Sequence, residues 1–158
     1  MKYCYVLFVK TGYEQKGAYT LKKALPNSLF NPFVPTKERF FRRNGTTMRI
    51  LEPCFKSYIF IESDLEPVEF SMVIDPLLYS VNEFFRIMDY GDKAEICMHE
   101  SERNQLMGLF GEDYCIKGSV GVVEGDQVMV QEGPLKGNES FIQRINRHKR
   151  HAIVYGRS

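Results

Sequence analysis

The residues best suited to chemistry lie in one basic run near the C-terminus, Arg147-His148-Lys149-Arg150-His151. Two predicted strands, Phe141–Ile145 and Ala152–Tyr155, flank this run, so it forms the tip of a hairpin. Glu139 is the only acid from position 136 onward, against these basic residues: Lys136, Arg144, Arg147, Lys149, Arg150 and Arg157. Lysine and arginine at an exposed tip neutralise phosphate groups, and arginine also binds guanine edges. The run is therefore predicted to bind nucleic acid; a solvated turn without a ligand is the alternative.

A second cluster of positive charge lies in a predicted hairpin, Lys37–Leu51. Arg42 and Arg43 directly precede Asn44-Gly45, which is the strongest two-residue signal for a hairpin turn. One interpretation is contact with the phosphate backbone of DNA, and the other is a solvated surface without a ligand. Three further lysines would extend this surface: Lys10, Lys22 and Lys23.

No set of residues has the types and spacing of a catalytic centre. Histidine occurs only at positions 99, 148 and 151, and no phosphate-binding glycine motif or H-E-x-x-H motif is present. The cysteines are far apart and include no C-x-x-C pair, so they are predicted to be buried thiols rather than zinc ligands or disulfides: Cys4, Cys54, Cys97 and Cys115. The chain is therefore predicted not to be an enzyme and to bind neither a metal nor a cofactor.

The formal net charge of +1 conceals a separation of charge along the 158 residues. Acids dominate Glu62–Asp113, whereas the two segments predicted to bind nucleic acid are basic. This separation favours contact with polyanions at selected surfaces. No apolar run approaches the roughly 18 residues of a membrane span, and Lys10 interrupts the first apolar stretch too early for an export signal. A cytoplasmic monomer without membrane contact is expected.

The elements that position these residues follow from periodicity and turn signals. Tyr3–Val9 is predicted to be a buried strand, and Glu14–Ala24 a helix. Phe55–Ile61 alternates with period two, so Tyr58 and Phe60 point away from the face that carries the apparent core residues. Further strands are predicted at Leu29–Pro35, Tyr79–Met88, Ala94–Met98 and Gln127–Gln131, and further helices at Pro67–Ile74 and Glu100–Leu109, the last with Leu106, Met107 and Leu109 inward.

Several segments, taken in order and spacing, resemble one known family. They are Tyr3–Lys10, Gly12-Tyr13-Glu14, Phe33-Val34-Pro35-Thr36, Pro53–Glu62 and Gly125–Val154. Together they resemble the NGN domain of the NusG transcription factors followed by a KOW motif. The resemblance implies an α+β fold, in which a four-stranded, mostly antiparallel sheet with helices precedes a small SH3-like β-barrel. The implied organisation is an NGN domain over residues 1–110, a linker over 111–121 and a KOW domain over 122–158.

The resemblance also implies that the main partner is bacterial RNA polymerase. In the family register, four aromatic residues would dock on the clamp helices of its largest subunit: Phe8, Tyr58, Phe60 and Phe84. If a second layer of helices covered these rings, they would be ordinary core, which is the alternative. The DNA that Lys10, Arg42 and Arg43 would contact is then upstream duplex or the non-template strand.

The solidly basic tip resembles that of the LoaP-type branch of specialised NusG paralogues. This implies processive antitermination at selected operons, with nascent RNA such as a hairpin bound by Lys136, Arg144, Arg147, His148, Lys149 and Arg150. The alternative is a general NusG-like factor whose KOW domain couples polymerase to the ribosome or to a termination factor. A ribosome-associated KOW protein is a third interpretation.

Three departures from the family pattern carry structural expectations. The segment Phe55-Lys56-Ser57-Tyr58 lacks the Pro-Gly pair of the usual turn before the strand. Ser140 replaces the glycine that closes the KOW motif, where a left-handed backbone would be costly for serine. The sequence ends at Ser158, so the barrel is expected to lack its last strand, of about fifteen residues, and to leave a sheet edge unpaired.

Overall fold

A computed structural model describes residues 1–158 with the exception of 90–94, 126, 147–150 and 155–158. The chain divides into two compact units. The first unit comprises Met1–Pro35 and Pro53–Arg103, and the second comprises Thr36–Glu52 and Asn104–Ser158. The hairpin in the second unit is therefore an insertion into the sequence of the first.

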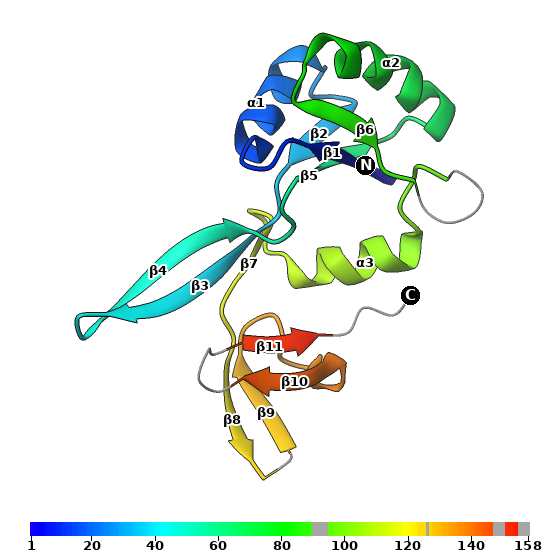
Figure 1. Cartoon of the computed structure of the whole chain (residues 1–158). Coiled ribbons are helices and arrows are strands. Elements are labelled where there is room, and N and C mark those ends of the chain that lie inside the picture. The colour runs from blue at the N-terminus through cyan, green and yellow to red at the C-terminus, as the bar shows by residue number, and fades with distance from the viewer. Residues whose placement is uncertain (90–94, 126, 147–150, 155–158) are drawn as a thin grey trace. The chain divides into compact units, whose positions relative to one another are not determined.

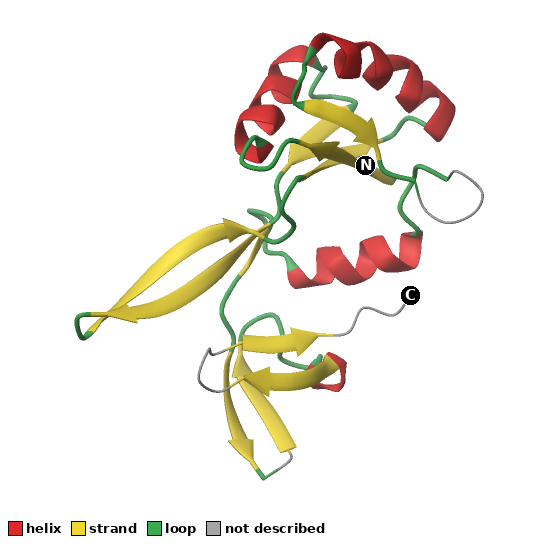
Figure 2. Ribbon diagram, in the orientation of Figure 1, coloured by secondary structure: helices red, strands yellow, loops and turns green. Residues whose placement is uncertain are grey.

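The first unit is built on a four-stranded antiparallel sheet in the order β2-β5-β1-β6. Figure 2 draws strands in yellow and helices in red. Its strands are β1 (Tyr3–Val9), β2 (Phe30–Phe33), β5 (Tyr58–Ser63) and β6 (Phe84–Ile87). The central pair β1–β5 is in continuous register from Tyr3 opposite Ser63 to Phe8 opposite Tyr58. The prediction of an α+β fold with a four-stranded antiparallel sheet is confirmed.

Two helices, α1 (Glu14–Ala24) and α2 (Pro67–Ser80), cover the same face of this sheet (Figure 1). They enclose an apolar core in which the rings of Tyr5 and Phe70 stack with centroids 3.6 Å apart. Leu21 of α1 is fully buried against the same cluster. Burial of rings and branched side chains on one face of the sheet is the main stabilising contribution to such a unit.

Two boundaries in the first unit differ from the sequence-based expectations. The helix expected to end at Ile74 continues through Pro76 to Ser80, because Leu77 and Leu78 pack against the core and compensate for the missing N–H of the proline. The strand expected over Tyr79–Met88 is consequently shorter, and β6 begins only at Phe84.

The segment that follows β6 also departs from the prediction. Ala94, the first residue of the strand predicted over Ala94–Met98, lies outside the described residues, and the rest of that segment forms an isolated bridge between Tyr5 and Cys97 instead of a strand. Helix α3 (Glu100–Leu109) has the predicted bounds, and none of its residues is fully buried: Leu106, Met107 and Leu109, which were predicted to point inward, are half-buried. Among the helices described, none combines the length and the apolar character that a membrane crossing requires.

The second unit contains the predicted hairpin, formed by β3 (Thr36–Arg43) and β4 (Thr46–Pro53). Asn44 and Gly45 both have positive φ, +50° and +79°, as the tight hairpin turn requires. Within the predicted linker, β7 (Cys115–Ile116) pairs in parallel with Thr36 and Lys37 at the start of β3. The root of the hairpin is therefore held by a segment far away in the sequence.

The C-terminal part of the second unit is β-rich, as expected for a KOW-type barrel. It consists of two antiparallel pairs, with β8 (Val120–Glu124) on β9 (Gln127–Glu132) and β10 (Ile142–Asn146) on β11 (His151–Val154). A short 3-10 helix, Glu139–Phe141, precedes β10 and contains Ser140. Ser140 is not among the described residues with positive φ, so the backbone there has avoided the left-handed conformation.

Candidate functional site

Three aromatic side chains meet on the face of the sheet opposite α1 and α2. The Phe8 ring of β1 lies 5.8 Å from the Tyr58 ring of β5 and 5.2 Å from the Phe85 ring of β6, measured between centroids. Phe8 and Tyr58 are half-buried, and Phe85 is 50% exposed. Large apolar side chains that touch one another and still face solvent are typical of a protein-binding surface. Phe8, Tyr58 and Phe85 are called the aromatic corner below.

A β-bulge decides which phenylalanine of β6 reaches this corner. Val9 pairs with Phe84, but Phe8 pairs with Arg86, so one extra residue of β6 is inserted opposite β1. The bulge turns Phe85 toward Phe8, whereas Phe84 is only 4% exposed and belongs to the core beneath α1. The predicted placement of Phe84 on the docking surface is therefore wrong, and sequence reasoning missed Phe85. The adjacent pair of phenylalanines near the end of an edge strand was the available signal.

Phe60 lies on the same sheet face as Tyr58, as predicted, but it is covered rather than exposed. Its ring packs edge-on against Phe33 and stacks on Phe55, with centroid distances of 5.7 Å and 5.5 Å. The resulting exposure is 4%, so the expectation of an accessible Phe60 is wrong. Period-two alternation correctly placed the side chain on a face, but it carried no information about the rings that cover it.

A buried carboxylate shapes the turn that leads into Tyr58. Ser57 has φ +70°, the left-handed region in which glycine is preferred. Its N–H donates a hydrogen bond to Glu14 Oε1 at 2.7 Å, and its hydroxyl lies in hydrogen-bond contact with that of Thr11. Serine thus adopts the conformation usual for the missing glycine, held by polar groups at the start of α1. The Gly12-Tyr13-Glu14 segment therefore has a structural role, which is to fix the start of β5.

The cations of the β3–β4 hairpin fall into two groups. Near the root, Lys37 and Arg39 both lie within 4 Å of Glu52, and Arg49 lies 2.9 Å from Glu38. The two arginines beside the turn, Arg42 and Arg43, are exposed and make no ion pair with any residue that the structure describes. An unpaired guanidinium is free to bind phosphate without first breaking an internal salt bridge.

In the first unit, exposed lysines occur on α1 and in the segment that precedes it. Lys10, Lys22 and Lys23 are exposed, and within the described part of the chain none forms an ion pair. Lys23 Nζ lies 4.6 Å from the centroid of the Tyr19 ring, a cation–π contact at an exposed aromatic side chain. Exposed ammonium groups can neutralise phosphate, and the predicted contact of these lysines with DNA stays a prediction.

The candidate nucleic-acid residues of the C-terminal part are only partly placed. Lys136 and Arg144 are both exposed, and Arg144 lies on β10 opposite Ile153. The remaining predicted members of this group lie outside the described residues: Arg147, His148, Lys149 and Arg150.

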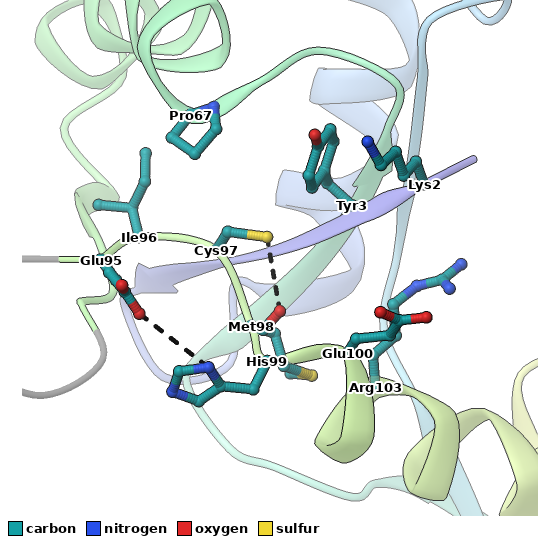
Figure 3. Close-up of a pocket in the computed structure, with 10 residues that line it drawn as sticks. All are labelled: Lys2, Tyr3, Pro67, Glu95, Ile96, Cys97, Met98, His99, Glu100 and Arg103. Atoms are coloured by element: carbon teal, nitrogen blue, oxygen red, sulfur yellow. Dashed lines mark hydrogen bonds and ion pairs between the residues drawn. The ribbon is translucent and has the colours of Figure 1, made fainter.

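A separate pocket of about 630 Å³ opens at the N-terminal end of β1 (Figure 3). It mixes acids, bases and apolar side chains, and His99 Nδ1 lies 4.0 Å from Glu95 Oε2 across its rim. Across the described positions, no group of three His, Cys, Asp or Glu side chains is arranged to hold a metal ion. The residues lining the pocket are Lys2, Tyr3, Pro67, Glu95, Ile96, Cys97, Met98, His99, Glu100 and Arg103.

Comparison with known proteins places this geometry in a family. No curated protein matches the chain. A family model described as transcription termination factor nusG matches residues 2–107, which is more than half of the chain. The match includes all of the aromatic corner, the whole β3–β4 hairpin and the lysines of α1. With the predicted sheet-and-helix fold present over the same residues, the chain belongs to the NusG family.

Proposed function

We propose that this protein binds RNA polymerase through the aromatic corner and acts as a transcription elongation factor that promotes antitermination at selected operons. The observation that carries the proposal is the mutual contact of Phe8, Tyr58 and Phe85 on a solvent-facing part of the sheet. Helices of a partner that present apolar side chains, such as the polymerase clamp helices, are suited to cover such a surface.

The corner has two properties expected of a docking surface. Its side chains come from three neighbouring strands, so the sheet fixes their spacing before any partner arrives. Its residues also contribute little to the core, which lies on the opposite face and includes Phe84 instead of Phe85. Binding at the corner would therefore not compete with folding.

Nucleic-acid contact is proposed as a second component of the same function. The unpaired Arg42 and Arg43 of the hairpin and the free lysines of α1 are suited to upstream or non-template DNA. Lys136 and Arg144, together with the basic run that follows them in sequence, are suited to the backbone of nascent RNA. A protein that holds polymerase and transcript together would oppose termination.

Polymerase binding is tested by pull-down of core RNA polymerase with purified variants. We expect Tyr58→Ala combined with Phe85→Ala to reduce retention by at least about tenfold, because two rings at the centre of a small interface are removed. Tyr79→Ala is the matched control, since Tyr79 is a highly exposed aromatic residue of the same unit outside the corner. Unchanged binding of the double variant would show that the corner is not the docking surface.

RNA binding separates antitermination from the general adaptor function. Fluorescence anisotropy with a leader RNA at two salt concentrations should give a steep salt dependence, reduced in a Lys136→Gln, Arg144→Gln variant. A general NusG factor would instead show no RNA preference and would bind a ribosomal or termination protein through its C-terminal part. That result would replace the antitermination proposal and leave polymerase docking intact.

A further inference from the structure

The first turn of α3 is joined to the sheet by charged groups. None of the ten residues of α3 is buried, whereas α1 and α2 both insert apolar side chains into the core. The contact that holds the turn is made by Arg103, whose Nη2 donates to the carbonyl oxygen of Met1 at 2.8 Å and lies 3.1 Å from Glu62 Oε1. The side chains of Arg103 and Glu62 are only 19% and 11% exposed, so this is a largely buried ion pair.

The acidic half of this pair is organised without α3. Glu62 lies on the inner strand β5, where its Oε2 accepts a hydrogen bond from Asn31 Nδ2 at 3.1 Å. Asn31 is the residue opposite Glu62 in the β2–β5 register, so the sheet itself holds the carboxylate in place. If Arg103 moved away, the Glu62 carboxylate would therefore keep its position.

The Arg103 guanidinium does not use all of its hydrogen-bond donors. Arg103 Nε is buried and has no hydrogen-bond partner among the described residues. A buried ion pair is stabilising only where further hydrogen bonds offset the cost of removing both charges from water. Because one guanidinium donor has no partner and no apolar side chain of α3 is buried, this contact should open at a lower free energy than the core.

The sheet surface next to the pair contains a buried thiol. Cys4 is the residue opposite Glu62 in the β1–β5 register and is completely buried. Burial raises the pKa of this thiol to about 12, and the charges of Glu62, Arg103 and Glu102 also act on it. The Met98 N–H, two residues before α3, donates a hydrogen bond to the carbonyl oxygen of Cys4 at 2.9 Å, so the start of α3 lies close to Cys4. Displacement of this turn would change the exposure of the thiol.

We propose that Arg103 and Glu62 form an ionic latch, which releases the first turn of α3 while the core stays folded and so uncovers the sheet surface around Cys4. When the latch is closed, Arg103 is paired with Glu62 at this face of the first unit. When it is open, the Glu62 carboxylate and the Cys4 thiol become accessible to solvent. It is independent of the aromatic corner, which lies at the other end of β1.

Cys4 provides the measurement. The intact chain is treated with N-ethylmaleimide, and labelled cysteines are identified by peptide mass spectrometry. In the unaltered protein, labelling of Cys4 should be slow and nearly independent of low urea concentrations, because a local opening exposes little surface. Arg103→Gln should increase the Cys4 labelling rate by at least about tenfold, while the amides of Leu7 and Val9 stay protected in hydrogen exchange. Arg103→Lys should give an intermediate rate, since it keeps the charge and loses the paired donors.

The matched control is Arg86→Gln, which removes an exposed ion pair to Asp89 in the same unit and should leave Cys4 labelling unchanged. Two results would overturn the latch. One is Cys4 labelling that rises with urea in parallel with global unfolding, already in the unaltered protein. The other is loss of Leu7 and Val9 protection together with Cys4 exposure in Arg103→Gln, which would make the pair a part of the core.

Discussion

Each of the two compact units is stabilised by a different kind of internal interaction. The first unit encloses a continuous apolar cluster between its sheet and the helices α1 and α2, with Tyr5 and Phe70 stacked inside it. In the described part of the second unit, only Cys115 and Val130 are buried hydrophobic residues. Stability that comes from apolar packing depends on shape and volume, so the first unit should respond mainly to changes in its core.

Polar contacts take a larger share in the second unit. Glu38 accepts a hydrogen bond from the Gly118 N–H at 2.9 Å and also pairs with Arg49. Glu139 accepts one from the Val130 N–H at 3.4 Å. Contacts of this kind weaken when a carboxylate is protonated, so the second unit should respond mainly to charge. One short chain can thus contain one unit whose stability depends mainly on apolar packing and another whose stability depends mainly on charge.

The largest effect is expected from the two adjacent phenylalanines of β6. Phe84→Ala should destabilise the first unit by about 3–5 kcal/mol, because a buried ring is lost, whereas Phe85→Ala should cost less than about 1 kcal/mol. Urea denaturation followed by circular dichroism measures both. Equal losses for the two variants would mean that the bulge does not separate a core residue from a surface residue.

A smaller loss is expected when the polar contact inside the first unit is removed. Glu14→Ala should cost about 2 kcal/mol, because the Ser57 N–H loses a charged acceptor. The neighbouring exposed Gln15→Ala serves as the control and should be nearly neutral. If Glu14→Ala were also neutral, the turn before β5 would not depend on this carboxylate.

Acid should act on the second unit before the first. Hydrogen bonds from the backbone N–H groups of Glu139 itself, Gly137 and Val130 lower the pKa of the Glu139 carboxyl below its ordinary value of 4.5. The unfolded chain has the higher pKa and binds the proton first, so the stabilisation is present above that ordinary value and is lost as the pH falls through the lowered one. Hydrogen exchange of β9 between pH 5 and about pH 3 should show this loss, and Glu139→Gln should reduce the pH dependence. Simultaneous loss of protection in β1 would contradict the prediction that acid affects the second unit before the first.

The smallest expected effect is a gain in stability. Ser57→Gly removes the strain of a left-handed serine and should stabilise the first unit by up to about 1 kcal/mol, partly offset by the lost hydroxyl contact with Thr11. Thermal unfolding is sensitive enough to detect it. A decrease in melting temperature would show that the hydroxyl contact outweighs the strain.

Much of the first unit could be predicted because its signals are local. The apolar strand Tyr3–Val9 and the helix Glu14–Ala24 have the predicted bounds. In the second unit, the hairpin turn at Asn44-Gly45 is likewise where the dipeptide indicated, since few other residues accept positive φ at both positions. Such features depend on the chain's own neighbours and need no knowledge of tertiary contacts.

The features that could not be predicted depend on distant residues. Phe85 reaches the corner through a bulge that is defined only by the pairing of β6 with β1. Phe60 is covered by Phe33 and Phe55, from other parts of the chain. Helix α2 passes Pro76 because core packing outweighs a local stop signal. At the candidate site, the alternation of the sequence therefore predicts which sheet face a side chain points to. Whether that side chain is exposed depends on tertiary contacts.

The exposed tip of the β3–β4 hairpin, with Arg42 and Arg43 beside the turn, has a consequence for limited proteolysis. Trypsin cleavage after Arg43 would divide the chain between β3 and β4. One fragment would contribute β1, α1 and β2 to the sheet of the first unit, and the other would contribute β5, α2 and β6. Because β5 lies between β2 and β1 in that sheet, the two fragments would stay interleaved and co-purify. A nicked protein would thus retain its aromatic corner while its hairpin is cut, which offers a way to examine the two surfaces one at a time.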